Sequence, residues 1–267
     1  AMTEDLVLDP HEKLTILAKI AEQSESPKDM KDYMKLRCAT GIALNADERD
    51  MLSAAYKAEI SELRTAIDTA HHEVEDMKLK NRVMEAGYAR GFAFRVGTEL
   101  SETCTELIQM VDPLLEKAEV GEPKTFYLKL QADYYRYMAE TPYAQGTLTQ
   151  KQLVEMCRTA YTTALKEAEF QLLTTHPVRL GLALNFAVFQ AESLSEVSAA
   201  LETARMARSG ALQALEGMPE EAWVDAAPLV MQLEDNIERW MSQLDAERRQ
   251  QQEEIIYGES PAQPKSH

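Results

Sequence analysis

Residues that interrupt helices are scarce in this sequence. Glycine and proline occur 10 times each in 267 residues, below their usual shares of roughly 7% and 5%. We find no convincing segment that alternates apolar and polar residues as a half-buried strand does. Alanine, leucine, methionine, glutamate, glutamine and lysine are frequent instead, and these residues favour helices. The composition therefore predicts an all-α protein.

Long apolar runs and clustered cysteines are also missing. The longest apolar-dominated run, residues 180–189, is about half of the ~20 residues that a membrane-spanning helix needs. We recognise no signal peptide at the start of the chain. Cys38, Cys104 and Cys157 are odd in number and far apart, which is typical of reduced thiols rather than of a disulfide framework or a zinc site. We expect a cytoplasmic protein without a membrane segment.

Positive charge is scarce as well. Lysine and arginine number 28 against 45 aspartates and glutamates, which gives a net charge of −17, so the phosphates of nucleic acids or anionic membranes would repel the chain. Phosphate loops, dinucleotide fingerprints, nucleophile elbows and kinase motifs are absent. His71 and His72 are adjacent and would point about 100° apart on a helix, which disfavours a shared metal. We expect no enzyme activity, metal or cofactor.

The helix-breaking residues gather in short, widely spaced segments. Between them, segments of roughly 15 to 35 residues carry apolar residues spaced three and four apart. This pattern predicts eight or nine helices, and their short connections favour antiparallel neighbours. The chain becomes polar from about Asp245, so we expect a helical domain over residues 1–244 and a polar tail over 245–267. The breaks are residues 24–27, 40–45, 121–123, 141–149, 174–177 and 217–219.

Two pairs of cations have the same spacing. Lys57 and Arg64 lie seven residues apart, nearly two full helical turns, so both point the same way. Lys129 and Arg136 repeat this spacing, and Tyr137 follows. Two such pairs on separate helices suit one anion site, because arginine offers phosphate a bidentate fork and tyrosine a further donor. The alternative is ordinary salt bridges to nearby carboxylates: Glu59, Glu62, Asp133 or Glu140.

A mixed stripe lies on a later predicted helix. Asn185, Val188 and Glu192 share one face, and an amide that donates and accepts suits an extended peptide backbone. A buried packing asparagine fits equally well. On the last predicted helix, three apolar residues are suited either to the core or to the wall of a groove: Leu229, Val230 and Leu233.

Four segments carry a recognisable pattern: residues 47–57, 124–140, 175–189 and 229–240. The second reads KTFYLKLQADYYRYMAE and the third reads THPVRLGLALNFAVF. Over roughly residues 10–241 the chain resembles the 14-3-3 proteins. The resemblance implies a bundle of about nine antiparallel helices that dimerises through its first four helices. It also implies a groove that binds phosphoserine or phosphothreonine peptides.

The resemblance assigns roles to individual residues. The phosphate-binding residues of the family match Lys57, Arg64, Arg136 and Tyr137, and a further groove lysine matches Lys129. The residues that clasp the peptide backbone match Asn185, Glu192 and Asn236. The apolar wall of the groove matches Leu184, Val188, Leu229, Val230, Leu233 and Trp240.

The sequence also departs from the family pattern. Asp68 stands where an arginine is usual, which lowers the local positive potential. Ser26 and Pro27 replace an arginine and a tyrosine, which removes a donor for an ion pair across the dimer. One residue is missing before Asn236, so Asn236 and Trp240 would be turned by about 100°.

The sequence therefore predicts a phosphorylation-dependent adaptor. Its partners would be phosphorylated client proteins and a second protomer, in a homodimer or in a heterodimer with a related chain. The alternative is a member that has lost phosphopeptide binding and acts as a structural or dimerisation subunit. Asp68 and the shortened last helix favour this alternative.

Overall fold

The computed structural model describes residues 9–141, 149–217 and 219–258, and within these ranges all regular structure is helical. Nine α-helices and one short 3-10 helix are found there, which confirms the predicted all-α fold. The chain divides into two compact units, residues 1–171 and 172–267. The single domain expected over residues 1–244 stays a prediction.

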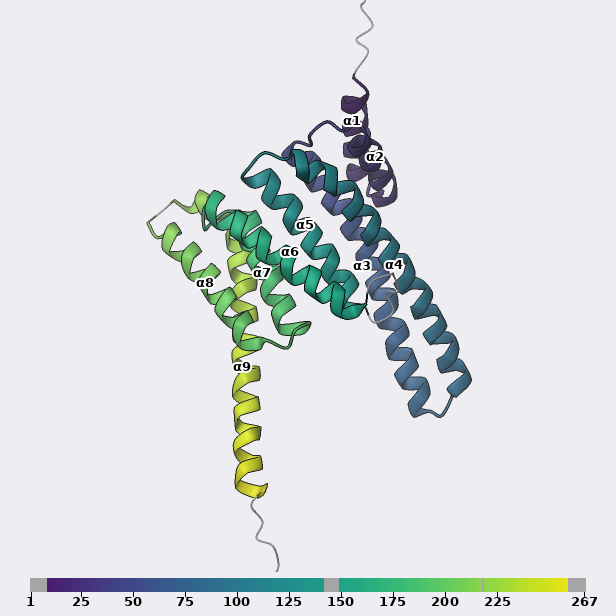
Figure 1. Ribbon diagram of the computed structural model, residues 1–267, viewed down its shortest axis with the longest axis vertical. Helices are drawn as coiled ribbons and strands as arrows, with labels where there is room; N and C mark the ends of the chain where they lie inside the picture. The colour runs from purple at the N-terminus through teal and green to yellow at the C-terminus, as the bar shows by residue number, and fades with distance from the viewer. Residues whose placement is uncertain (1–8, 142–148, 218, 259–267) are drawn as a thin grey trace, which may run out of the picture. The chain divides into compact units, whose positions relative to one another are not determined.

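The described residues of the first unit form six helices, and each packs against the next one along the chain. Figure 1 shows α3 and α4 side by side as a long hairpin. The short connections therefore join neighbouring helices, as the break segments predict. The helices are α1 (Pro10–Gln23), α2 (Pro27–Ala39), α3 (Ala46–Leu79), α4 (Val83–Lys117), α5 (Glu122–Glu140) and α6 (Gln150–Gln171).

Local signals explain where these helices begin. Pro10 and Pro27 occupy first-turn positions, where the missing N–H costs nothing. Asn45 caps α3, because its Oδ1 accepts from the Glu48 N–H at 2.9 Å while the Glu48 carboxylate accepts from the Asn45 N–H at 2.9 Å. Such a capping box gives hydrogen-bond acceptors to two backbone N–H groups that have no partner within the helix.

The core of the first unit follows the apolar spacing of its helices. On α3, Leu52, Tyr56 and Ile60 are at most 2% exposed, and Leu100 and Cys104 of α4 are fully buried. All three cysteines are buried and free, and burial raises the pKa of the Cys38 thiol to about 12. The thiols are therefore packing groups at neutral pH rather than nucleophiles.

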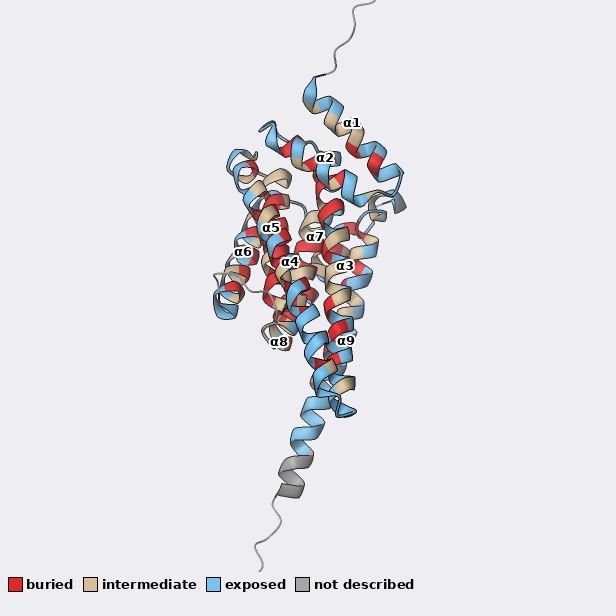
Figure 2. Cartoon of the chain, turned by 90° about the vertical axis from the view of Figure 1, so that its right-hand side faces the viewer, coloured by how far each residue is buried: buried red, intermediate tan, exposed pale blue. Residues whose placement is uncertain are grey.

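The second unit contains α7 (Pro177–Glu192), α8 (Val197–Leu215), the 3-10 helix η1 (Glu220–Trp223) and α9 (Ala227–Gly258). Helices α7, α8 and α9 pack against one another around a core of their apolar faces. Helix α9 continues to Gly258, and its residues 245–252 are exposed, pale blue in Figure 2. The predicted polar tail thus begins as helix, and its residues 259–267 lie outside the described part.

Candidate functional site

Two helices of the first unit supply the predicted phosphate-binding residues. Helix α3 carries Lys57 and Arg64, and α5 carries Arg136 and Tyr137. Arg64 Nη2 donates to Glu140 Oε2 at 3.1 Å, and Arg136 Nη1 donates to Glu140 Oε1 at 2.8 Å. The two arginines therefore converge on one carboxylate.

The ring of Tyr137 lies close to both guanidinium groups. The Arg64 guanidinium carbon is 5.1 Å from the ring centroid, and that of Arg136 is 4.7 Å away. Both distances are within the range of cation–π attraction. Burial raises the pKa of Tyr137 to about 12, so at neutral pH the phenol stays protonated and can donate a hydrogen bond to an anion.

A pocket of about 250 Å³ opens beside these residues, wholly within the first unit. Its lining combines the cations of α3 with hydroxyl groups and one carboxylate. Lys57 is exposed, and in the described residues it has no ion-pair partner. The pocket thus offers positive charge and hydrogen-bond donors to a small anion. Its lining residues are Lys57, Ile60, Ser61, Arg64, Thr65, Asp68 and Tyr137.

Arg136 is fixed by a series of polar contacts with buried residues of α5 and α6. Arg136 is 7% exposed, and its Nε donates to the Tyr161 hydroxyl at 3.1 Å. The Tyr161 hydroxyl donates to Asp133 Oδ1 at 2.5 Å, and Lys129 Nζ donates to Asp133 Oδ2 at 2.7 Å. Burial would raise the pKa of Asp133, but Lys129 and Arg136 outweigh it and lower this pKa below its usual value. Asp133 is therefore a carboxylate that helps to fix Arg136.

Three of the four spaced cations form the salt bridges that the alternative interpretation predicts. Lys129 pairs with Asp133, and both Arg64 and Arg136 pair with Glu140. The salt bridges and a phosphate site are compatible, because the same contacts bring the cations together. The sequence pattern does not single out Tyr161, because it lies among buried apolar residues of α6 such as Cys157 and Ala164.

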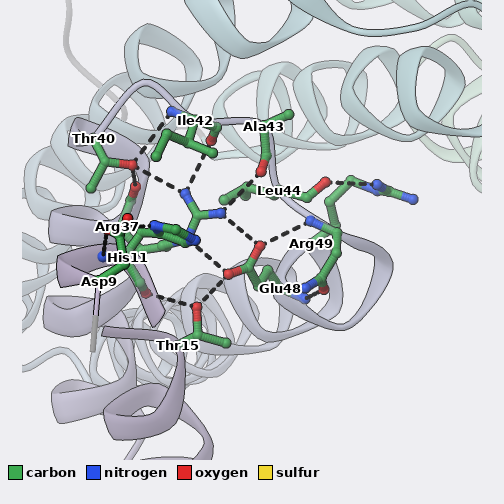
Figure 3. A network of polar contacts seen from close by, with 11 residues as sticks. Asp9, His11, Thr15, Arg37, Thr40, Ile42, Ala43, Leu44, Glu48 and Arg49 are labelled. Atoms are coloured by element: carbon green, nitrogen blue, oxygen red, sulfur yellow. Dashed lines mark hydrogen bonds and ion pairs between the residues drawn. The ribbon is translucent and has the colours of Figure 1, made fainter. Parts of the chain in front are cut away.

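A second polar cluster, at the start of the first unit, was also missed (Figure 3). Arg37 and Glu48 have side chains that are each 2% exposed, and they are joined at 2.7 and 2.9 Å. Arg37 also donates to the carbonyls of Ile42 and Ala43 at 3.0 and 2.9 Å, and Thr15 donates to Glu48. This cluster ties α1, α2 and the start of α3 together.

The proposed peptide-contacting residues of the second unit differ in exposure. Asn185, Val188, Leu229 and Asn236 are half-buried, and Glu192 is exposed. Leu184, Val230, Leu233 and Trp240 are buried in the core of the unit. One side of α9, an arc of about 60° on an unbroken helix, carries Leu229, Leu233, Asn236 and Trp240.

The Arg239 side chain contacts two of the residues that are proposed to bind the peptide backbone. Its Nη2 donates to Asn236 Oδ1 at 2.9 Å and lies 3.5 Å from Glu192 Oε1. The clasp role of Asn236 and Glu192 stays a prediction. A ligand that used both residues would have to displace Arg239.

Two classes of feature are not found in the part of the chain that the structure describes. No helix there is long and apolar enough to span a membrane. No group of three or more histidine, cysteine, aspartate or glutamate side chains in these residues is placed to hold a metal ion.

Comparison with known proteins identifies the family of the chain. A model of the 14-3-3 protein family matches residues 17–241. The 14-3-3-like protein 1 of Caenorhabditis elegans is 34% identical over 248 residues, which cover 91% of this chain and 96% of that protein. The 14-3-3 protein zeta of Bombyx mori is 36% identical over 235 residues, 86% of this chain and 92% of that protein. Because these matches extend over most of both chains, the chain belongs to the 14-3-3 family.

Proposed function

We propose that this protein is an adaptor that binds client segments carrying phosphoserine or phosphothreonine. Family membership supports an adaptor role that binds clients as a dimer. The observation that carries the phosphate dependence is the convergence of Arg64, Arg136 and Tyr137 next to the Lys57 pocket. Lys57, Arg64 and Tyr137 line a space large enough for a phosphate. Arg136 lies beside it, against the ring of Tyr137 and on the same carboxylate as Arg64.

The chemistry of these donors favours phosphate over an unmodified hydroxyl. A phosphorylated residue carries a charge of about −1.5 to −2 and three acceptor oxygens at pH 7. Each charge-assisted hydrogen bond contributes about 1.5–3 kcal/mol. An unmodified serine has one hydroxyl and no charge, so it recovers little of this energy.

For the second unit we propose the peptide-contacting role that the resemblance implies. Asn185 and Asn236 carry amides that can donate and accept, as a peptide backbone requires. Val188 and Leu229 are the half-buried members of the proposed apolar wall and have surface left for a ligand. The buried members, which include Trp240, would act by supporting them.

The alternative, a structural subunit without phosphopeptide binding, is not favoured. It would leave the shared Glu140 contact of Arg64 and Arg136 without a use beyond stability. Asp68 in the pocket and Arg239 on Asn236 reduce the attraction for a phosphopeptide. Neither removes any of the four phosphate-binding residues.

We also propose that the dimer forms through the N-terminal helices, as a homodimer or with a related chain. An apolar groove of about 560 Å³ lies between α3 and α4, and its walls include Ala66, Tyr88 and Phe92. Helix α1 exposes Ile16 and Ile20, which provide apolar surface for such a contact. Burial of these groups against a second protomer would remove apolar area from water.

A titration of matched peptides tests the phosphate dependence. Fluorescence anisotropy would compare a labelled peptide with serine or phosphoserine at one position. We expect the phosphorylated form to bind at least 10-fold more tightly. Lys57→Gln should weaken its binding about 10-fold or more, since one charge-assisted contact is lost.

Lys166→Gln is the matched control, because Lys166 is an exposed lysine on α6 of the same unit and lies outside the pocket lining. It removes the same charge from the same unit. Equal binding of the two peptides by the wild type would overturn the proposed function. Equal weakening by both variants would reduce the role of Lys57 to general electrostatics.

A further inference from the structure

Asp68 is the only carboxylate in the lining of the 250 Å³ pocket, among the residues that the structure describes. It lies one helical turn after Arg64 on α3 and is exposed. Arg64 does not pair with it, because the Arg64 guanidinium contacts Glu140 at 3.1 Å and Tyr137 instead. No described cation neutralises Asp68, so its charge faces whatever enters the pocket.

The charges of the pocket and of a bound phosphate do not balance. The pocket lining and the Arg136–Glu140 pair beside it contain the cations Lys57, Arg64 and Arg136 and the carboxylates Asp68 and Glu140, and 3 − 2 leaves a net charge of +1. A phosphate brings about −1.5 to −2. The ligand and the pocket lining together are then negative, and a cation beside the phosphate would restore the balance.

We propose that Asp68 determines specificity, by selecting phosphorylated segments that carry a lysine or arginine next to the phosphate. An ammonium or guanidinium group there would pair with the Asp68 carboxylate while the phosphate contacts Lys57 and Arg64. An acidic neighbour would meet Asp68 as a like charge and weaken binding. This inference rests on the proposed function and adds a preference for the ligand.

The test is a coupling measurement between Asp68 and the ligand. One set of phosphoserine peptides carries a single lysine, placed in turn at each of the three positions on either side, and the reference peptide carries glutamine there. For the wild type, we expect lysine at one or more positions to tighten binding about three- to five-fold, the size of an exposed ion pair. Asp68→Asn should abolish that gain, and Asp68→Lys should reverse it in favour of a glutamate peptide.

Asp50→Asn is the matched control for the overall acidity of the chain. Asp50 is exposed on the same helix, and 18 residues amount to five full turns, so it shares the side of Asp68 at about 27 Å. It makes the same change in net charge. The lysine preference should survive in this variant.

The outcomes separate this inference from the proposed function. Selective phosphopeptide binding with an equal lysine preference in wild type and Asp68→Asn would overturn the inference alone. Equal binding of phosphorylated and unphosphorylated peptides by the wild type and every variant would overturn the proposed function and the inference together. Phosphopeptide binding gained only in Asp68→Asn would show that Asp68 blocks the pocket, which also contradicts the inference.

Discussion

Replacing Glu48 by glutamine would remove one charge of the buried Arg37–Glu48 pair and keep the size of the side chain. Both side chains are 2% exposed, and the carboxylate accepts from Arg37 Nε at 2.7 Å and from Nη2 at 2.9 Å. Loss of one partner of a buried pair costs about 3–5 kcal/mol, because the other charge stays buried without compensation. We expect a cost in this range for the first unit.

Thermal and urea unfolding followed by circular dichroism would measure this cost. For a domain of 150–250 residues, a change of 1 kcal/mol shifts Tm by about 2–4 °C, so Glu48→Gln should lower Tm by about 6–20 °C. Asp47→Asn is the control. Asp47 lies in the same first turn of α3, and its pair with Lys19 at 3.0 Å is exposed, so its loss should cost at most about 1 kcal/mol.

The pH dependence gives a second readout. Burial would raise the pKa of Glu48, but hydrogen bonds from Arg37 and Thr15 outweigh it and lower this pKa below its usual value. A lowered folded pKa contributes stability that is present above the unfolded value and is lost as the pH falls through the folded value. Glu48→Gln should therefore flatten the loss of stability below about pH 4.5. Equal Tm shifts for Glu48→Gln and Asp47→Asn would refute this reasoning.

Two further predictions concern assembly and the peptide clasp. Phe92→Glu should yield monomers at tens of micromolar in sedimentation equilibrium, because it places a charge in the apolar α3–α4 groove. The control Phe170→Glu changes a residue that is 85% exposed and should leave the mass unchanged. A dimeric Phe92→Glu variant would contradict the proposed dimer surface. Arg239→Leu should tighten phosphopeptide binding about two- to five-fold by freeing Asn236 and Glu192. The control Arg205→Leu changes an exposed arginine on α8 and should leave binding unchanged. Weaker binding by Arg239→Leu would contradict a competition between Arg239 and the peptide for Asn236 and Glu192.

The sequence predicts most helix boundaries, because proline, glycine and capping residues act locally. The break expected at residues 24–27 separates α1 from α2, and that at 174–177 precedes α7. The turn at residues 80–82 was missed, since it contains neither glycine nor proline. Asn81 adopts φ +58° there, a conformation that asparagine tolerates but does not require. Ser195 does the same at φ +56° before α8.

The candidate site was predictable only to the level of helix faces. Seven-residue spacing placed Lys57 with Arg64 and Lys129 with Arg136, because it follows from the helical repeat. The contact of both arginines with the Glu140 carboxylate could not be predicted from the helical repeat. Arg64 and Glu140 are 76 residues apart, and their contact depends on the packing of separate helices.

The structure predicts different effects for variants of the three proposed phosphate-binding cations. Arg136 is 7% exposed and is held by Tyr161 and Glu140, so Arg136→Ala would remove buried contacts together with a proposed phosphate donor. The Arg64 side chain is 42% exposed and shares Glu140, so a phosphate competes for it with a carboxylate already in place. Lys57 is exposed, and its charge can meet a phosphate without displacing another described group. A loss of affinity in a Lys57 variant therefore reports on the ligand, whereas the same loss in an Arg136 variant combines binding with stability.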